Sequence, residues 1–274
     1  MKLATIRVGD STVAVRVDGD KAVEITGYAS ISELLTNGSL EEAAAANGTE
    51  YDFASADIAP VVPDPSKIVC VGVNYRNHIK EMGREPAEFP TLFTKFKESL
   101  LGPNDDFPIP PESDAIDYEG ELALIIGKKV RRARGEEAKA AIAGFTVAND
   151  GTMRDWQYRT TQWFQGKGWE NSTPLGPVMI TPEELPADAH MVTRLEGQVM
   201  QDTPVDDLLF DTVALVEYIS TMFTLNPGDI ILTGTPGGVG HARKPPVYVQ
   251  PGQTVTVTID GIGELVNKAV PEIV

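Results

Sequence analysis

The chain has 274 residues, of which 42% are hydrophobic and 23% charged, a composition typical of a globular protein with a large core. Its formal net charge of −17 argues against nucleic-acid binding, and no run of about 18 apolar residues could cross a membrane. Cys70 is the only cysteine, which excludes an internal disulfide. Because the first residues also lack the apolar core of a signal peptide, the sequence predicts a cytoplasmic protein.

Residues 1–62 are predicted to form a small N-terminal domain of strands and short helices. The segments 2–8 and 11–17 alternate apolar and polar residues around Gly9-Asp10, a pair typical of a hairpin turn. Further elements expected here are a strand at 22–26 and short helices at 31–35 and 40–46. A proline-rich connector then leads out of this predicted domain.

The second predicted domain, 63–274, carries every residue to which we assign chemistry. Its elements follow no βαβ rhythm, which favours an α+β fold with a β-rich core. The strands expected in it are 67–73, 91–96, 117–127, 144–148, 177–180, 191–200, 229–233 and 254–270. The expected helices are 74–83, 135–143, 211–223 and one that begins near Met153 and carries Arg154 and Gln157.

The acidic segment from Asp117 to Gly127 has the pattern of a buried strand. Side chains alternate between the faces of a strand, so Asp117, Glu119 and Glu121 share one face. Buried carboxylates require basic partners or a cation, and Mg²⁺ or Mn²⁺ prefers such oxygens. Asp150 is the candidate for a third ligand. From spacing alone, a metal site and a solvated acidic face with a turn aspartate remain alternatives.

His78 and Glu81 stand at positions i and i+3 of a predicted helix and therefore share a face. A carboxylate that orients an imidazole makes a general base, and the alternative is an ordinary surface pair. By contrast, His190 and His241 have no such neighbour and are expected at the surface. Lys95 is a candidate for an anion contact, but a solvated surface charge is the more common alternative for such a residue.

Two glycine-rich segments suggest nucleotide binding but do not have the required spacing. Lys167 lies between glycines, yet no Ser or Thr follows it as a phosphate loop requires. Residues 234–240 lack the dinucleotide-binding spacing. We interpret the latter as a loop that shapes a substrate pocket, with Thr235 as a candidate hydrogen-bond donor.

Several motifs, in a fixed order, make the chain similar to the fumarylacetoacetate hydrolase family over about residues 67–270. They are Gly72-Val73-Asn74-Tyr75 with His78 and Glu81, Phe93-Thr94-Lys95, Asp117 to Leu122, Asn149-Asp150 with Arg154-Asp155 and Gln157, Gly166-Lys167-Gly168, Pro174-Leu175-Gly176-Pro177, and Gly228-Asp229 through Thr233-Gly234-Thr235-Pro236 to Gly238-Val239-Gly240. The chain departs from the pattern at Glu170, where many members carry Asp.

This resemblance implies a β-rich fumarylacetoacetate-hydrolase-like fold, a homodimer and a bound Mg²⁺ or Mn²⁺. It assigns Glu119, Glu121 and Asp150 as metal ligands, and His78 with Glu81 as the catalytic pair. It also places Lys167 and Gln157 on the oxyanion side, and Arg154 and Thr235 near the substrate.

The activity expected from the residues and the resemblance is metal-dependent hydrolysis of a carbon–carbon bond in an anionic 2,4-dioxo acid. In this hypothesis His78 activates a water, and cleavage passes through a metal-bound enolate. The alternative is decarboxylation or tautomerisation of an oxaloacetate-like 2-oxo acid, or isomerisation of a 2-hydroxyhepta-2,4-diene-1,7-dioate-like compound. A second alternative is a non-catalytic module that binds a metal or a carboxylate.

Overall fold

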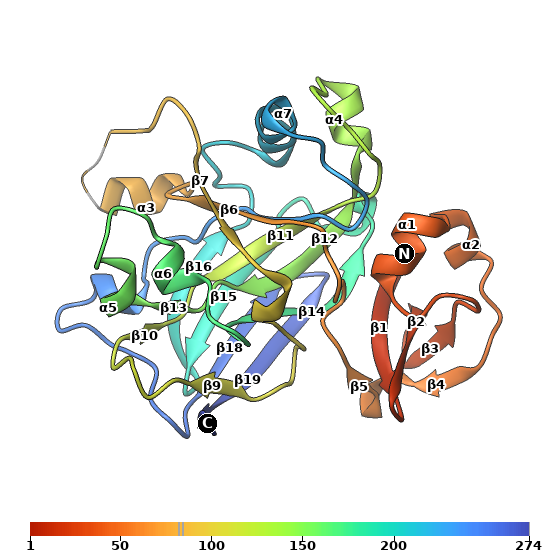
Figure 1. Ribbon diagram of the computed structural model, residues 1–274, viewed down its shortest axis with the longest axis horizontal. Coiled ribbons are helices and arrows are strands. Elements are labelled where there is room, and N and C mark those ends of the chain that lie inside the picture. The colour runs from red at the N-terminus through yellow and green to blue at the C-terminus, as the bar shows by residue number, and fades with distance from the viewer. Residues whose placement is uncertain (82, 84, 274) are drawn as a thin grey trace.

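A large mixed sheet and a smaller sheet packed on it dominate the fold of the computed structural model (Figure 1). The structure describes residues 1–81, 83 and 85–273, and it describes His78 and Glu81 by their backbone alone. Strands outweigh helices and both kinds of element are present, so the predicted α+β, β-rich class is confirmed.

The large sheet has 12 strands, and its central strands are fully buried. In spatial order its path runs through β4 (Glu50–Asp52), β3 (Lys21–Glu24), β2 (Ser11–Asp18), β1 (Lys2–Val8), β14 (Thr173–Ile180), β12 (Ile142–Asn149), β11 (Gly120–Ile126), β17 (Ile230–Leu232), β6 (Ile68–Gly72) and β7 (Thr91–Lys95). Two short strands, β5 (Asp57–Ile58) and β8 (Leu100–Leu101), pair with β1 and β14.

The second sheet has five strands and lies against β11, β12 and β14 of the large one. Its order is β16 (Gln198–Pro204), β15 (His190–Leu195), β18 (Thr254–Ile259), β19 (Gly263–Pro271) and β9 (Phe107–Ile109), and a separate pair joins β10 (Ile116–Asp117) to β13 (Thr152–Met153). The α-helices are α1 (Ile31–Asn37), α2 (Leu40–Ala44), α3 (Arg76–Glu81), α4 (Glu136–Ala140), α5 (Arg154–Gln157), α6 (Phe164–Lys167) and α7 (Thr212–Met222).

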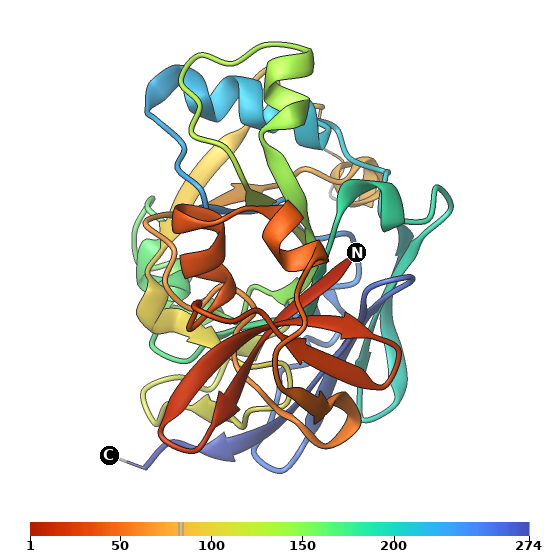
Figure 2. The same cartoon turned by 90° about the vertical axis from the view of Figure 1, so that its right-hand side faces the viewer.

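The N-terminal strands and helices stand at one end of the large sheet, on the right in Figure 1 and facing the viewer in Figure 2. The predicted hairpin is confirmed, because β1 and β2 pair from Lys2↔Val17 to Val8↔Ser11 across the turn at Gly9-Asp10. Through the pair Leu3↔Met179, β1 also joins β14, so the large sheet extends into this part of the chain. The division into domains at residue 62 stays a prediction.

Strand β11 contributes to two apolar cores because its side chains alternate. Leu122, Leu124 and Ile126 belong to the core shared with the smaller sheet. Ala123 and Ile125 belong to the core on the opposite face. The acidic residue Glu121 precedes them on that second face, as the alternation predicts.

The predicted continuous strand 117–127 is wrong at its beginning, where the structure has two strands, β10 and β11, with a break at residues 118 and 119. The backbone N–H groups of residues 118–120 donate to side-chain oxygens of Asp117, Asn149 and Gln201 at 2.9–3.0 Å. Side chains thus replace a neighbouring strand as hydrogen-bond acceptors, and the chain leaves regular pairing while its polar groups stay satisfied.

A second correction concerns residues 191–200, which form a hairpin of β15 and β16 and not one strand. The turn residues Glu196 and Gly197 have φ of 51° and 76°. Two successive positive φ values define the turn that matches the twist of a hairpin. The usual Asn-Gly or Asp-Gly signal is missing here, because glutamate occupies the first position.

The central position of β11 gives a test of the fold. Leu124 is fully buried between the sheets, so Leu124→Ala should lower the free energy of unfolding by about 2–5 kcal/mol. Val266→Ala is the matched control, because Val266 on β19 is 36% exposed, and it should cost less than about 1 kcal/mol. Urea denaturation measures both, and equal losses would contradict this account of the core.

Candidate active site

A cavity of about 220 Å³ opens where β6, the break before β11, and α5 and α6 meet. Part of its wall is apolar and comes from Val71, Phe93, Trp163 and Val239. Six of the predicted site residues line it, namely Glu119, Glu121, Arg154, Gln157, Lys167 and Thr235. Residues far apart in the sequence therefore converge on one small, mixed polar and apolar cavity.

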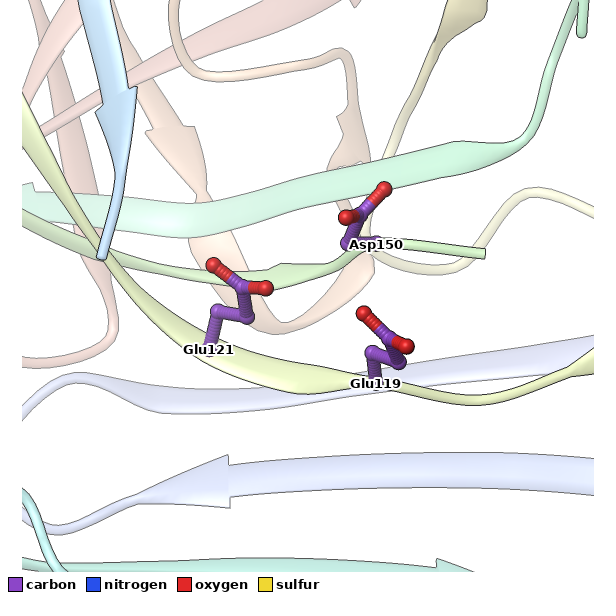
Figure 3. Close-up of side chains that lie close together, drawn as sticks. All are labelled: Glu119, Glu121 and Asp150. Carbon is purple, nitrogen blue, oxygen red and sulfur yellow. The ribbon is translucent and has the colours of Figure 1, made fainter. Parts of the chain in front are cut away.

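Three carboxylates gather beside this cavity (Figure 3). Glu119 and Glu121 extend from the start of β11, and Asp150 follows the end of the neighbouring strand β12. One oxygen from each lies within 4.8 Å of the others, and all three residues are buried. A set of three buried carboxylate oxygens suits a hard divalent cation such as Mg²⁺ or Mn²⁺, so these residues could hold one.

Two buried lysines balance the carboxylates. The Nζ of Lys167 lies 2.6 Å from both Glu119 Oε2 and Asp150 Oδ2. The other oxygen of Asp150 accepts from Lys95 Nζ at 2.7 Å, and Lys95 is 1% exposed. The expectation of a surface charge at Lys95 is therefore wrong. Charge-assisted hydrogen bonds of this kind offset the cost of burying the ions.

The pKa values of the cluster diverge. Burial favours neutral Asp150, yet the charges of Lys167 and Lys95 outweigh it and lower the pKa of this carboxyl. Burial also opposes the charge of Lys167, but Asp150 and Glu119 hold the pKa of its ammonium above the usual value. For Glu121, burial together with the charges of Asp150 and Glu119 raises the pKa. Lys167 thus serves as a donor to these two carboxylates.

Arg154 connects the triad to the loop after β17. Its Nε donates to Asp117 Oδ2 at 2.8 Å, and its Nη1 donates to Gln157 Oε1 at 2.9 Å. Its Nη2 lies 2.5 Å from Glu119 Oε1, which is close enough for an ion pair. The geometry there is not that of a hydrogen bond, and Nη2 is a buried atom with no hydrogen-bond partner among the described residues.

Asp117 lies outside the triad and organises the backbone around it. Its carboxylate accepts from Arg154 and from the backbone N–H groups of Tyr118, Gly240 and His241 at 2.8–2.9 Å. This carboxylate holds the loop after β17 against the break before β11.

Thr235 holds the same loop from its other end. Its hydroxyl donates to the carbonyl of Gly120 at 2.9 Å and accepts from Gln201 Nε2 at 2.8 Å. The single hydroxyl proton of Thr235 is therefore used within the protein, while its side chain still lines the cavity.

Helix α3 carries the predicted pair His78 and Glu81, whose side chains lie outside those that the structure describes. The helix begins at Arg76, three residues after Val73, which lines the cavity. The role of this pair in the site stays a prediction.

Lys167 and Glu170 differ in their surroundings. Lys167 is the last residue of helix α6. Glu170, at which the chain departs from the family pattern, is exposed, while Lys167 is buried among the carboxylates.

His241 is the second residue that sequence reasoning placed wrongly at the surface. It is partly buried and lines the cavity together with Tyr158. Of the two aromatic residues beside it, Tyr158 comes from a distant segment and Tyr248 from the irregular segment that follows, so no helix or strand pattern marks this position. His190 is exposed and faces Asp202, as expected of a surface residue.

The fold and the site agree with the comparison to protein families. A family model described as fumarylacetoacetate (FAA) hydrolase C-terminal matches residues 67–270. The chain therefore belongs to the fumarylacetoacetate hydrolase family.

Individual relatives are similar over most of the chain. The human protein named oxaloacetate tautomerase FAHD2A, mitochondrial, is 43% identical over 218 residues, which is 78% of this chain and 69% of that protein. Fumarylacetoacetate hydrolase from Exiguobacterium antarcticum superposes with a TM-score of 0.88 at 33% identity, covering 99% of this chain and 100% of that one. The structure of 2-hydroxyhepta-2,4-diene-1,7-dioate isomerase from Mycobacterium marinum gives 0.82 at 32% identity, covering 99% of both chains.

The buried contact between Lys95 and Asp150 leads to a prediction about stability. Lys95→Met removes one partner of a buried ion pair, which should lower the free energy of unfolding by about 3–5 kcal/mol. Lys97, two residues after Lys95, forms an exposed ion pair with Asp64 and provides the control. Lys97→Met should lower the free energy of unfolding by at most about 1 kcal/mol. Thermal and urea unfolding of both variants would show the difference, and a stable Lys95→Met protein would refute the structural role of the buried pair.

Proposed function

We propose that this enzyme moves a proton and a double bond in 2-oxo dicarboxylates, as an oxaloacetate-type tautomerase or a related isomerase. The observation that carries the proposal is the buried Lys167, whose Nζ donates to Glu119 and Asp150 beside a small cavity lined by carboxylates. Such a site suits stabilisation of the negative oxygen of an enolate. The names of the relatives support it, because one is an oxaloacetate tautomerase and another an isomerase of an unsaturated dioate.

We further propose that Glu119, Glu121 and Asp150 hold a divalent cation, Mg²⁺ or Mn²⁺. Their buried oxygens provide a hard, anionic set of ligands, and Lys95 fixes the carboxylate of Asp150 from behind. When bound, such a cation supplies Lewis-acid polarisation of the substrate's 2-oxo acid group.

The protein residues then account for the proton transfer. We propose that His78, oriented by Glu81, removes a proton from C3 of the substrate, and that the electron pair moves to the C2 oxygen. Lys167 donates a hydrogen bond to the negative charge that develops on that oxygen. Gln157, held by Arg154 through its Oε1, keeps its amide N–H₂ available as a further donor. Return of the proton to oxygen or carbon completes the keto–enol exchange.

Hydrolysis of a 2,4-dioxo acid stays a second candidate, which the likeness to the Exiguobacterium hydrolase favours. It needs a water placed by the same base, and so it uses the same residues with one additional reactant. A cytoplasmic location and a homodimer stay predictions as well. Among the described residues, no helix is long and apolar enough to cross a membrane.

Metal binding can be tested with an isosteric change. Glu121→Gln removes a charge from the triad and should weaken Mn²⁺ binding at least about tenfold and abolish turnover, since carboxylate charge sets the affinity for hard cations. Glu170→Gln is the control, because Glu170 is exposed and the same charge is removed. Calorimetric titration of Mn²⁺ into chelator-treated protein measures the affinity. Unchanged Mn²⁺ binding by Glu121→Gln would refute the metal site.

A substrate panel tests the reaction. With Mn²⁺ present, the enzyme should accelerate the keto–enol exchange of oxaloacetate more than it accelerates the hydrolysis of an acylpyruvate. Ultraviolet absorbance measures the rate of both reactions. His78→Ala should reduce the exchange by about 10²–10⁴-fold, the usual contribution of a general base, and should leave Mn²⁺ binding intact. Rapid acylpyruvate hydrolysis with no effect on oxaloacetate would instead establish the hydrolase.

A further inference from the structure

His241 occupies a fixed position on the cavity wall. It lies in the short 3₁₀ turn η4 (Gly240–Ala242) and lines the same cavity as Glu119 and Lys167. The backbone N–H groups of Gly240 and His241 donate to the two oxygens of Asp117 at 2.8 and 2.9 Å. A Cβ at Gly240 would overlap the carbonyl oxygen of Val247, so only glycine permits this close approach.

The imidazole ring is held by two tyrosines. The Tyr158 ring centroid lies 5.1 Å from that of His241 with 33° between the ring planes, and the Tyr248 centroid lies 6.3 Å away with 29° between the planes. The Nδ1 atom is 2.9 Å from the Tyr248 hydroxyl. Burial raises the pKa of Tyr248, so this hydroxyl keeps its proton, and we assign it as the donor to Nδ1.

That assignment leaves the Nε2 of His241 carrying a hydrogen. The described part of the chain has no hydrogen bond to Nε2, and His241 lines the cavity, so this N–H can donate to a ligand. Burial and the nearby charge of Arg154 lower the pKa of His241, which keeps the ring neutral and in this tautomer at neutral pH.

Arg154 extends the donor group toward the triad. Its Nε and the backbone N–H of His241 share one oxygen of Asp117, and its Nη2, beside Glu119, has no hydrogen-bond partner among the described residues. The guanidinium of Arg154 and the imidazole of His241 therefore line one cavity and are joined through Asp117. Both are groups that bind a carboxylate.

We propose that His241, together with Arg154, binds the second carboxylate of the substrate and selects dicarboxylates over monocarboxylates. This rests on the proposed function, in which the 2-oxo acid end of the substrate lies at the triad. His241 is then the residue that determines how the far end of the substrate is recognised, while the triad and Lys167 act on the reacting end.

Two matched ligands test the proposal on the Mn²⁺-loaded protein. Malate and lactate share the 2-hydroxy acid group, and only malate carries a second carboxylate. Loss of a hydrogen bond to a charged group changes affinity by about tenfold or more. His241→Leu should therefore weaken malate binding by at least about tenfold in calorimetric titration and leave lactate binding unchanged. His241→Gln, which keeps an N–H donor, should recover part of the malate affinity.

Two further variants separate recognition from structure. Tyr248→Phe removes the hydroxyl that fixes the ring and should reduce the preference for malate over lactate with a smaller effect than His241→Leu. His190→Leu removes an exposed histidine of β15 and should leave both ligands unaffected. Under turnover, His241→Leu should raise the KM for oxaloacetate about tenfold or more with little change in kcat, and should leave phenylpyruvate, a 2-oxo monocarboxylate, unaffected.

An equal loss of malate and lactate affinity in His241→Leu, or no loss of either, would overturn the proposal. The proposed function and the proposed role of His241 can be refuted independently of each other. A wild-type protein that does not act on oxaloacetate removes the proposed function, while the malate and lactate comparison still decides the role of His241.

Discussion

The structure depends on the burial of several carboxylates in one place. Asp117, Glu119, Glu121 and Asp150 all lie within the protein, where an uncompensated charge would prevent folding. Lys95, Lys167 and Arg154 supply the opposite charge, and backbone N–H groups supply further hydrogen bonds. Each partner comes from a different segment, so assembling this cluster brings β7, the end of β12, α5 and α6 to the start of β11.

The interruption between β10 and β11 is a consequence of this cluster. Regular pairing through residues 118–120 would use the N–H groups that now donate to Asp117, Asn149 and Gln201. The break frees the chain to place Glu119 beside Asp150 while Glu121 stays on the regular strand. Loop 234–241 is connected to the same point, through Gly234 to Glu121 and through Gly240 to Asp117.

Much of the fold could be predicted from local patterns, because alternation and turn residues act over short distances. The β1–β2 hairpin and the two faces of β11 follow directly from such patterns. The break at residue 118 could not be predicted, because its acceptors include Asn149 and Gln201, which lie far away in the sequence. The hairpin at Glu196-Gly197 was missed because its backbone adopts the expected turn with an unusual first residue.

In the candidate site, too, some residues could be predicted from local sequence and others only from the fold. Residue types and spacing made Glu119, Glu121 and Asp150 candidates, the resemblance to the family assigned them, and the structure brings them together. The burial of Lys95 and the position of His241 depend on contacts with Asp150 and with Tyr248, so only the assembled fold reveals them.

The near balance of charge in this cluster also bears on how the protein matures. Four carboxylates meet three cationic side chains before any ion is added, which differs from a zinc finger, whose ligands cannot stay together without metal. The polypeptide can therefore reach its native conformation without an ion. If the proposed divalent ion binds, it can be taken up after folding and exchanged without unfolding, so that local supply decides which ion the protein carries.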